Sequence, residues 1–375
     1  MSLSAARPSL SEFAEQEAAA LSARGVLRRV VSLARPSPVT VTHEGKTYLS
    51  FSSNDYLGLS RHPKVIAAAT AALESGAGAG AARLVTGNHP GYSALEKALA
   101  TWKGKEAALI FGSGYLANIG VIPALAGRGD VIIADRLCHA SMLDGAMLSG
   151  AKLVRFRHND LAHCAEQLEE HRGKGNCLIL TESVFSMDGD KAPLAALGEL
   201  ADRHQAWLIV DDAHGMDTQG LEAAHLVIGT LSKALGAYGG FACGAAGVMD
   251  YLLSAARSLV FSTALPPSVI AAAHAALDVM QAEPELAART LAHARRFTAL
   301  LGLAEAQSPI VPVIMGESGA ALEAMEKLKD KGFWVTAIRP PTVPEGTARL
   351  RVTFSSAHEN QHIDALAEAV KEVTP

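Results

Sequence analysis

The sequence predicts an α/β fold with a mostly parallel sheet flanked by helices, followed by a smaller C-terminal α+β domain. Short, continuous apolar runs recur through the middle of the chain, as expected for strands that are buried on both faces of a parallel sheet. Helical segments separate many of these runs. The predicted strands cover residues 107–111, 131–134, 153–156, 177–181, 207–210, 226–229 and 240–243.

The remaining elements divide the chain into three predicted parts. Residues 1–50 form a helical arm and a hairpin, residues 51–265 a large domain, and residues 266–375 a small C-terminal domain. The apolar spacing over 1–35 predicts one helical arm that ends at Pro36 and Pro38, and Glu44-Gly45 marks the turn of a hairpin. A helix in the large domain is expected to end at Gly104. The small domain contains predicted helices over 266–301, 320–331 and 361–373 and predicted strands over 309–315, 333–338 and 348–353.

The composition excludes several classes of protein. Of the 375 residues, 49% are hydrophobic and the net charge is −5, with no Lys/Arg block, so nucleic acid and membrane surfaces are not expected partners. No apolar stretch reaches the roughly 18 residues that a membrane span needs, and no secretory signal precedes the arm. The cysteines lack CxxC spacing, which predicts reduced thiols and a cytoplasmic location. They are Cys138, Cys164, Cys177 and Cys243.

Three predicted strands are followed by residues that can hold a phosphorylated cofactor. Gly112-Ser113-Gly114 opens a helix whose N-terminus can bind an anion. Asp211 ends a buried strand, where a carboxylate requires a cation or metal as partner. Lys233 precedes a Gly-rich turn, where desolvation would lower its pKa and favour Schiff-base chemistry. Each motif alone has a simpler explanation: the glycine-rich segment as an ordinary turn, Asp211 as a structural hydrogen bond and Lys233 as a solvated side chain. Together, in this order along the chain, the three motifs indicate a pyridoxal 5'-phosphate (PLP) enzyme.

Eight stretches of the chain resemble the α-oxoamine synthase family of fold-type-I PLP-dependent transferases. They run from the end of the arm almost to the last helix, and the last of them resembles the biotin-pathway branch of the family. The resemblance implies a homodimer in which each subunit completes the active site of the other. The stretches are FSSNDYLGLSRHP (51–63), FGSGYLAN (111–118), DRLCHASMLDGA (135–146), SVFSMDGDKAPL (183–194), LIVDDAHG (208–215), TLSKALG (230–236), FSTALPP (261–267) and TAIRPPTVPEGTARLR (336–351).

The activity that this resemblance implies is a PLP-dependent acyl transfer. L-alanine would condense with pimeloyl-CoA, or with a pimeloyl-carrier protein, and lose CO2, as a step of biotin biosynthesis. Three alternatives remain open from the residues: a sister enzyme that uses glycine or serine with another acyl-CoA, a PLP aminotransferase or aldolase on the same fold, and a non-catalytic protein of this fold.

The resemblance also implies a role for each matched residue. Lys233 would form the Schiff base and carry the proton at Cα, Asp211 would pair with the pyridinium nitrogen, and His214 would bind the phenolic oxygen. His139 would stack on the ring. Further cofactor contacts would come from Ser113, Gly114, Tyr115, Ser186 and Thr230, with Ser262 and Thr263 from the neighbouring subunit. Asn54 and Arg351 would bind the amino-acid carboxylate, and Arg28 and Thr342 would contact the acyl-CoA or the product chain. No metal ligand is expected.

Overall fold

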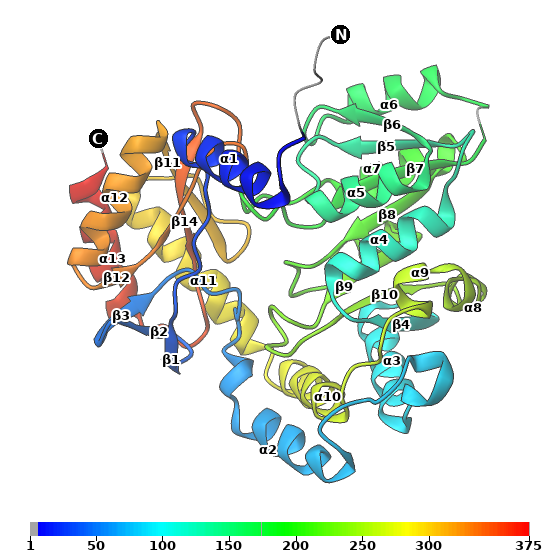
Figure 1. Ribbon diagram of the computed structural model, residues 1–375, viewed down its shortest axis with the longest axis horizontal. Coiled ribbons are helices and arrows are strands. Elements are labelled where there is room, and N and C mark those ends of the chain that lie inside the picture. The colour runs from blue at the N-terminus through cyan, green and yellow to red at the C-terminus, as the bar shows by residue number, and fades with distance from the viewer. Residues whose placement is uncertain (1–6, 174, 375) are drawn as a thin grey trace.

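The computed structural model describes residues 7–173 and 175–374, and a seven-stranded sheet forms the centre of its large lobe (Figure 1). The strand order is β4-β10-β9-β8-β7-β5-β6. The strands from β6 to β9 pair in parallel, and β10 runs antiparallel to both of its neighbours. The strands are β4 (Ala107–Phe111), β5 (Val131–Asp135), β6 (Lys152–Phe156), β7 (Cys177–Glu182), β8 (Trp207–Asp211), β9 (Leu226–Thr230) and β10 (Gly240–Gly244). All seven predicted strands and the mostly parallel sheet are confirmed.

Helices cover both faces of this sheet because its strands are apolar on both sides. Along β5, Ile132 and Ala134 pack into the core on one face, whereas Val131 and Ile133 pack into the core on the other, as the period of two requires. The first face carries α4 (Gly114–Leu125), α5 (Ala140–Ser149), α8 (Ala246–Ala255) and α9 (Arg257–Val260). The second face carries α2 (Pro63–Ala72), α3 (Pro90–Lys103), α6 (Leu161–Glu170), α7 (Leu194–Arg203) and α10 (Pro267–Ala282).

The ends of α3 illustrate how local sequence sets a boundary. The His89 side chain accepts a hydrogen bond from the Gly91 N–H, and Pro90 occupies the first turn, where no intrahelical N–H partner is needed. Gly104 closes the helix with a φ of 63°, a left-handed conformation that glycine adopts without strain. The predicted end at Gly104 is confirmed.

The small lobe contains a three-stranded sheet, β11-β14-β13, covered by helices. Its core includes Phe297, Leu350 and Phe354, each fully buried. The predicted helices and strands of this region are confirmed, except that 266–301 is divided into two helices, α10 and α11, and 333–338 into two short strands. The elements are α11 (Glu285–Leu301), β11 (Ile310–Gly316), α12 (Ser318–Asp330), β12 (Phe333–Trp334), β13 (Thr336–Ile338), β14 (Ala348–Thr353) and α13 (Asn360–Val373).

The N-terminal arm differs from its prediction as a single helix. Within the described part, α1 (Leu10–Ala23) starts at a Ser9/Glu12 capping box and ends before Gly25, which takes a φ of 67°. The chain then runs without helix or strand to β1 (Ala34–Ser37), so the prediction of one helix over 1–35 is wrong beyond residue 23. Residues 1–6 of that prediction lie outside the described residues. The predicted hairpin is confirmed as β2 (Thr40–His43) and β3 (Lys46–Ser50).

Two packing relationships cross the predicted domain boundaries, which remain predictions. β3 pairs in parallel with β12, so β12 joins the N-terminal strands in a separate four-stranded sheet, β1-β2-β3-β12. Helix α10 packs against α2 and α3 of the large lobe (Figure 1). Short helical turns complete the chain at η1 (Leu59–Arg61), η2 (Leu73–Ser75), η3 (Arg83–Gly87) and η4 (Leu221–Ala223). Within residues 7–173 and 175–374, no helix is both long and apolar enough to cross a membrane.

Candidate active site

Lys233 lies just beyond β9, at the edge of the sheet where the parallel strands end. Its Nζ is 2.8 Å from Nε2 of His214, which follows β8. Burial lowers the pKa of Lys233, although Asp211 and Glu182 oppose that shift. Burial, together with the charge of Lys233, holds the pKa of His214 well below its usual range. The two groups that the sequence placed on separate strands are therefore in contact.

A chain of hydrogen bonds leads from His214 to the small lobe. Nδ1 of His214 is 2.6 Å from the Tyr56 hydroxyl, which donates to Oδ1 of Asn54 at 3.1 Å. Arg351 Nη1 donates to the same Asn54 oxygen at 3.2 Å. Because the hydroxyl hydrogen goes to Asn54, the His214 Nδ1–H donates to Tyr56, and His214 Nε2 accepts from Lys233. The structure thus brings together Asn54, Arg351, His214 and Lys233.

Arg349 and Arg351 point to the same side of β14, and their partners differ. Arg349 Nη1 donates to Oδ1 of Asp188 at 2.5 Å, so its charge is matched within the protein. Arg351 Nε donates to the Ser186 carbonyl oxygen at 2.6 Å. Among residues 7–173 and 175–374, Arg351 forms no ion pair with a carboxylate, although it is only 8% exposed. A buried guanidinium without a carboxylate can bind an incoming anion.

Asp211 is the reverse case, a buried carboxylate without an ion-paired cation among the described residues. Its side chain is buried, accepting from Asn118 Nδ2 at 2.7 Å and from the Ala213 N–H at 2.9 Å. In the described parts of the chain no Lys, Arg or His forms an ion pair with it. Because burying a carboxylate requires a compensating charge, this position suits a cationic ring nitrogen of a bound cofactor.

An anion cradle lies at the N-terminus of α4. Ser113 caps the helix by accepting the Leu116 N–H, and the backbone of Ser113 and Gly114 packs directly against Gly240. A Cβ added at Gly240 would lie 2.4 Å from the Ser113 carbonyl, and one at Gly114 would lie 3.4 Å from Thr230. These small residues leave the positive end of α4 accessible beside the Thr230 hydroxyl, as a phosphate site requires.

His139 is the N-cap of α5, and its Nδ1 faces the helix. Ser141 approaches that nitrogen twice, with Oγ at 2.7 Å and its backbone N–H at 3.2 Å. Partial burial and Lys233 lower the pKa of His139, while Asp211 opposes this. His139 as a whole residue is exposed, so part of it is accessible to a bound group.

Glu182 was not predicted as a site residue. It ends β7 directly opposite Asp211 on β8, and its Oε1 has no hydrogen-bond partner among the described residues. Burial, reinforced by Asp211, raises the pKa of Glu182 well above its usual range. The direction of this shift favours the neutral acid form of Glu182. A carboxylate at the buried end of a strand is the sequence signal that could have identified it.

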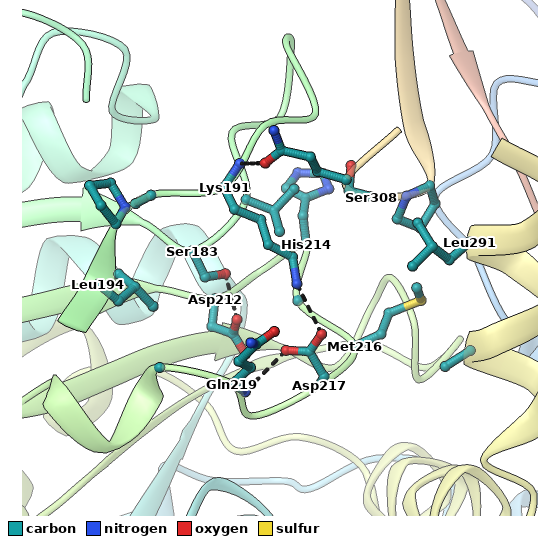
Figure 2. A pocket seen from close by; sticks show the side chains of 18 of the residues that line it. Ser183, Lys191, Leu194, Asp212, His214, Met216, Asp217, Gln219, Leu291 and Ser308 are labelled. Carbon is teal, nitrogen blue, oxygen red and sulfur yellow. Dashed lines mark hydrogen bonds and ion pairs between the residues drawn. The ribbon is translucent and has the colours of Figure 1, made fainter. Parts of the chain in front are cut away.

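A buried ion pair fixes the loop that carries Asp211 and His214. Lys103 Nζ donates to Asp212 Oδ2 at 2.6 Å, and the Ser183 hydroxyl donates to Asp212 Oδ1 at 2.5 Å. Gly215 must lack a side chain, because a Cβ there would overlap Asp212. Asp212 and His214 line a cavity of about 630 Å³ that reaches α11 (Figure 2). The network holds the loop between this cavity and Lys233.

The remaining predicted residues have no hydrogen bond to Lys233 among the described residues. The Tyr115 hydroxyl donates to Asp144 at 2.5 Å and its ring is exposed. Ser262 and Thr263 line a small cavity beside Gly112 of the same chain. Arg28 and Thr342 are both exposed, and Arg339, which donates to the Gly25 carbonyl at 3.1 Å, links their segments. The contacts expected of these residues with bound groups stay predictions.

Sequence reasoning missed Tyr56, Asn118 and Ser141 as well as Glu182. All three lie inside stretches that carry the family resemblance, but nothing in their local spacing indicates their partners. Asn118 meets Asp211 across 93 residues of chain, and Tyr56 meets His214 across 158. The contacts depend on the fold rather than on a local motif.

Comparison with known proteins finds relatives along nearly the whole chain. Residues 46–370 match the family model described as aminotransferase class I and II. The 8-amino-7-oxononanoate synthase of Methylobacterium nodulans is 57% identical over 369 residues, covering 98% of this chain and 97% of that protein. A serine palmitoyltransferase variant from S. paucimobilis, solved with bound PLP and myriocin, has a TM-score of 0.90 and 31% identity over 98% of both chains. The 8-amino-7-oxononanoate synthase of Francisella tularensis has a TM-score of 0.74 and 27% identity over 87% of this chain and 98% of that one.

These matches establish the class of protein. The chain belongs to the aminotransferase class I and II family and has the fold-type-I architecture of PLP-dependent transferases. Within that class it is a PLP-dependent acyltransferase of the 8-amino-7-oxononanoate synthase family.

The residues present fit PLP, the cofactor of this class. Among the described residues Asp211 is a buried carboxylate without an ion-paired cation, the α4 N-terminus is an anion cradle, and Lys233 is a partly buried amine just beyond β9. The ring nitrogen of PLP would pair with Asp211, its phosphate would bind at the α4 N-terminus, and its aldehyde carbon would react with Lys233.

Proposed function

We propose that this enzyme condenses L-alanine with pimeloyl-CoA, or with a pimeloyl-carrier protein, to give 8-amino-7-oxononanoate, the free thiol and CO2 in biotin biosynthesis. The name of the M. nodulans relative and its 57% identity over nearly full length support the product. The hydrogen-bond chain from Arg351 through Asn54, Tyr56 and His214 to Lys233 carries the proposal, since it connects a carboxylate-binding arginine to an amine that can take the Cα proton.

Lys233 and Asp211 have complementary roles in this proposal. Bound PLP supplies the electron sink for the negative charge that develops at Cα. Lys233 would hold the cofactor covalently until the amino group of alanine takes its place, and the freed lysine amine would then remove the Cα proton of alanine and later return a proton to that carbon. Asp211 keeps the ring nitrogen protonated, because its buried charge is otherwise unmatched. His214 orients Lys233 before the cofactor binds, and its Nε2 would face the phenolic oxygen once the cofactor replaces the Lys233 hydrogen bond.

Other residues bind the substrates and the phosphate. Arg351 and Asn54 hold the alanine carboxylate until it leaves as CO2. His139 stacks on the ring and donates to the thioester oxygen as it becomes negative. The acyl chain extends toward Arg28 and Thr342. The phosphate contacts come from Ser113, Gly114, Tyr115 and Thr230, with Ser186 beside the ring.

The proposal includes a cytoplasmic homodimer. Val85 and Phe261 are 74% and 71% exposed, and the bridge between Ala82 and Thr263 brings their segments together. No residue of α1 is buried, although Leu10 and Phe13 are apolar. Exposed apolar side chains of this kind favour burial against a second copy. Ser262 and Thr263 would then reach the phosphate of the partner's site.

A product assay tests the proposal. Purified protein is incubated with PLP, L-alanine and pimeloyl-CoA, and the products are followed by thiol release and mass spectrometry. We expect one free thiol and one CO2 for each 8-amino-7-oxononanoate formed, and no turnover by a Lys233→Ala control. Thiol release without the amino-ketone product would contradict the proposal.

A second candidate is condensation of serine, because the structural similarity to serine palmitoyltransferase is high. The same assay with L-serine or glycine and a long-chain acyl-CoA distinguishes it. If serine supports a higher kcat/KM than alanine, the enzyme is a sister of the proposed one.

A further inference from the structure

Asn118 on α4 bridges a carboxylate and a hydroxyl at the bottom of the site. Its Nδ2 lies 2.7 Å from Asp211 Oδ2 and 2.9 Å from Ser141 Oγ. An ionised carboxylate can only accept hydrogen bonds, so the amide nitrogen rather than the oxygen must face Asp211. Both amide hydrogens are then committed. Asn118 and Ser141 are each only 1% exposed, so the arrangement is shielded from bulk water.

The hydrogen bond from Asn118 sets the direction of the next one, from the Ser141 hydroxyl to His139. Because its Oγ accepts from Asn118, its own hydrogen is available to His139 Nδ1, 2.7 Å away. The backbone N–H of Ser141 also donates to that nitrogen at 3.2 Å. Two donors directed at one ring nitrogen require that nitrogen to carry a lone pair. The ring hydrogen of neutral His139 therefore lies on Nε2.

The charged surroundings of His139 favour the neutral ring. The ring caps the N-terminus of α5, where the helix dipole disfavours a cation. Lys233, beyond β9, acts in the same direction, while Asp211 on β8 and Asp144 on α5 oppose it. Partial burial also lowers the pKa of His139. In the described ranges no partner is found for Nε2, so its hydrogen is available to a bound group.

We propose that Asn118 and Ser141 are positioning residues that hold His139 as a neutral imidazole protonated at Nε2. This proposal rests on the proposed function in one respect: the thioester oxygen is the acceptor that Nε2–H would meet as the carbon nucleophile adds to the carbonyl. The hydrogen-bond path also ties the orientation of His139 to the ionised Asp211. Loss of either bridge residue would weaken the reaction without removing a group that touches the substrate.

Nitrogen NMR of 15N-histidine-labelled enzyme loaded with PLP tests the tautomer directly. The His139 signals are assigned by their loss in His139→Gln. We expect an unprotonated Nδ1 and a protonated Nε2 at neutral pH, whether or not the enzyme accepts pimeloyl-CoA. A His139 protonated on Nδ1 would overturn the inference and would leave the proposed function standing.

Ser141→Ala separates positioning from general stability. Removing the hydroxyl takes a donor from neutral His139, so its titration midpoint should rise by about half to one pH unit. With the productive substrates, kcat should fall about tenfold while the KM for the amino acid stays within about twofold. Ser149→Ala is the matched control, because Ser149 lies on the same helix. Within the described residues its hydroxyl hydrogen-bonds only to nearby backbone, donating to the Ala146 carbonyl and accepting from the Ala151 N–H.

Comparing the His139 titration midpoint and kcat of the variants with those of the wild type tests whether Ser141 and Asn118 position His139. If Ser141→Ala leaves the His139 midpoint and kcat as Ser149→Ala does, Ser141 is not a positioning residue. If Ser141→Ala does not fold, Asn118→Ala should still move the His139 midpoint in the same direction, since the Ser141 hydroxyl then loses the donor that orients it. An unchanged midpoint in Asn118→Ala would overturn the bridge.

Discussion

Nζ of Lys233 lies 2.8 Å from Nε2 of His214, and the direction of the neighbouring hydrogen bonds makes the histidine the acceptor. A neutral His214 can accept from the lysine without repelling it. Burial lowers the pKa of both groups, which is consistent with this arrangement. His214 therefore holds Lys233 in a fixed position before a substrate arrives. That position depends on Tyr56, which binds the other ring nitrogen of His214.

Tyr56→Phe tests this dependence. The substitution removes the acceptor of the His214 Nδ1–H in a fully buried place, and an unsatisfied buried donor costs about 1–3 kcal/mol. We expect a lower free energy of unfolding by that amount and a kcat reduced about tenfold, because His214 no longer orients Lys233. Denaturant unfolding and steady-state rates measure the two effects. Tyr48→Phe, in the buried face of the hairpin, is the control and should change neither.

Arg351→Lys should weaken amino-acid binding in particular. Lysine keeps the positive charge but loses the planar fork that donates to Ser186 and Asn54 while it faces a carboxylate. The KM for alanine should rise about 10- to 100-fold, which corresponds to about 1.4–2.8 kcal/mol. Arg349→Lys is the matched control on the same strand, since its charge is already paired with Asp188. Equal KM values for the two variants would contradict a substrate role for Arg351.

The sequence predicted the sheet well because strands buried on both faces carry a local signal. Each of the runs from 107–111 to 240–243 is a short apolar stretch, and each became a strand. The end of the arm helix at Ala23 was missed, although Gly25 is the local reason for it. The pairing of β3 with β12 joins segments nearly 300 residues apart, and no local pattern specifies such a partner.

The site residues likewise divide into those that local sequence predicts and those that depend on tertiary contacts. Asp211 and Lys233 could be predicted because each follows an apolar strand, and strand ends of a parallel sheet lie along one edge. The alternation along 348–353 predicts that Arg349 and Arg351 lie on one side of a strand. It could not tell which arginine is already paired, because Asp188 is distant in sequence. The partners of Asn118 and Tyr56 likewise emerge only from tertiary contacts.

Glu182→Gln should leave the enzyme active. Glu182 is buried beside Asp211, and burial raises the pKa of Glu182 well above its usual range, which favours the neutral acid. Glutamine has the same shape and no charge, so we expect a kcat within about threefold of wild type. Asp211→Asn, the matched change on the neighbouring strand, should lose most turnover and PLP affinity, because there the charge is needed. A Glu182→Gln enzyme as inactive as Asp211→Asn would show that Glu182 acts as an anion.

His158 links three strand-end segments through its two ring nitrogens. Nδ1 is 3.1 Å from Asp135 at the end of β5, and Nε2 is 2.8 Å from Asp190, in the loop that carries Ser186. The ring also packs edge-on against Phe185. Burial opposes a charge on this ring, but the hydrogen bonds and charges of both aspartates outweigh it and raise the pKa of His158 to about 10.

This cluster predicts a pH-dependent part of the stability. The folded pKa of His158 lies above its unfolded value of about 6.5, so the stabilisation is complete below pH 6.5 and is lost as the pH rises toward 10. His158→Gln should therefore lower the free energy of unfolding most at pH 6, on the order of 2 kcal/mol, and progressively less up to pH 10. Urea unfolding of both proteins across this range measures the difference. A constant difference from pH 6 to pH 10 would mean that the ring is neutral and that packing on Phe185 is its contribution.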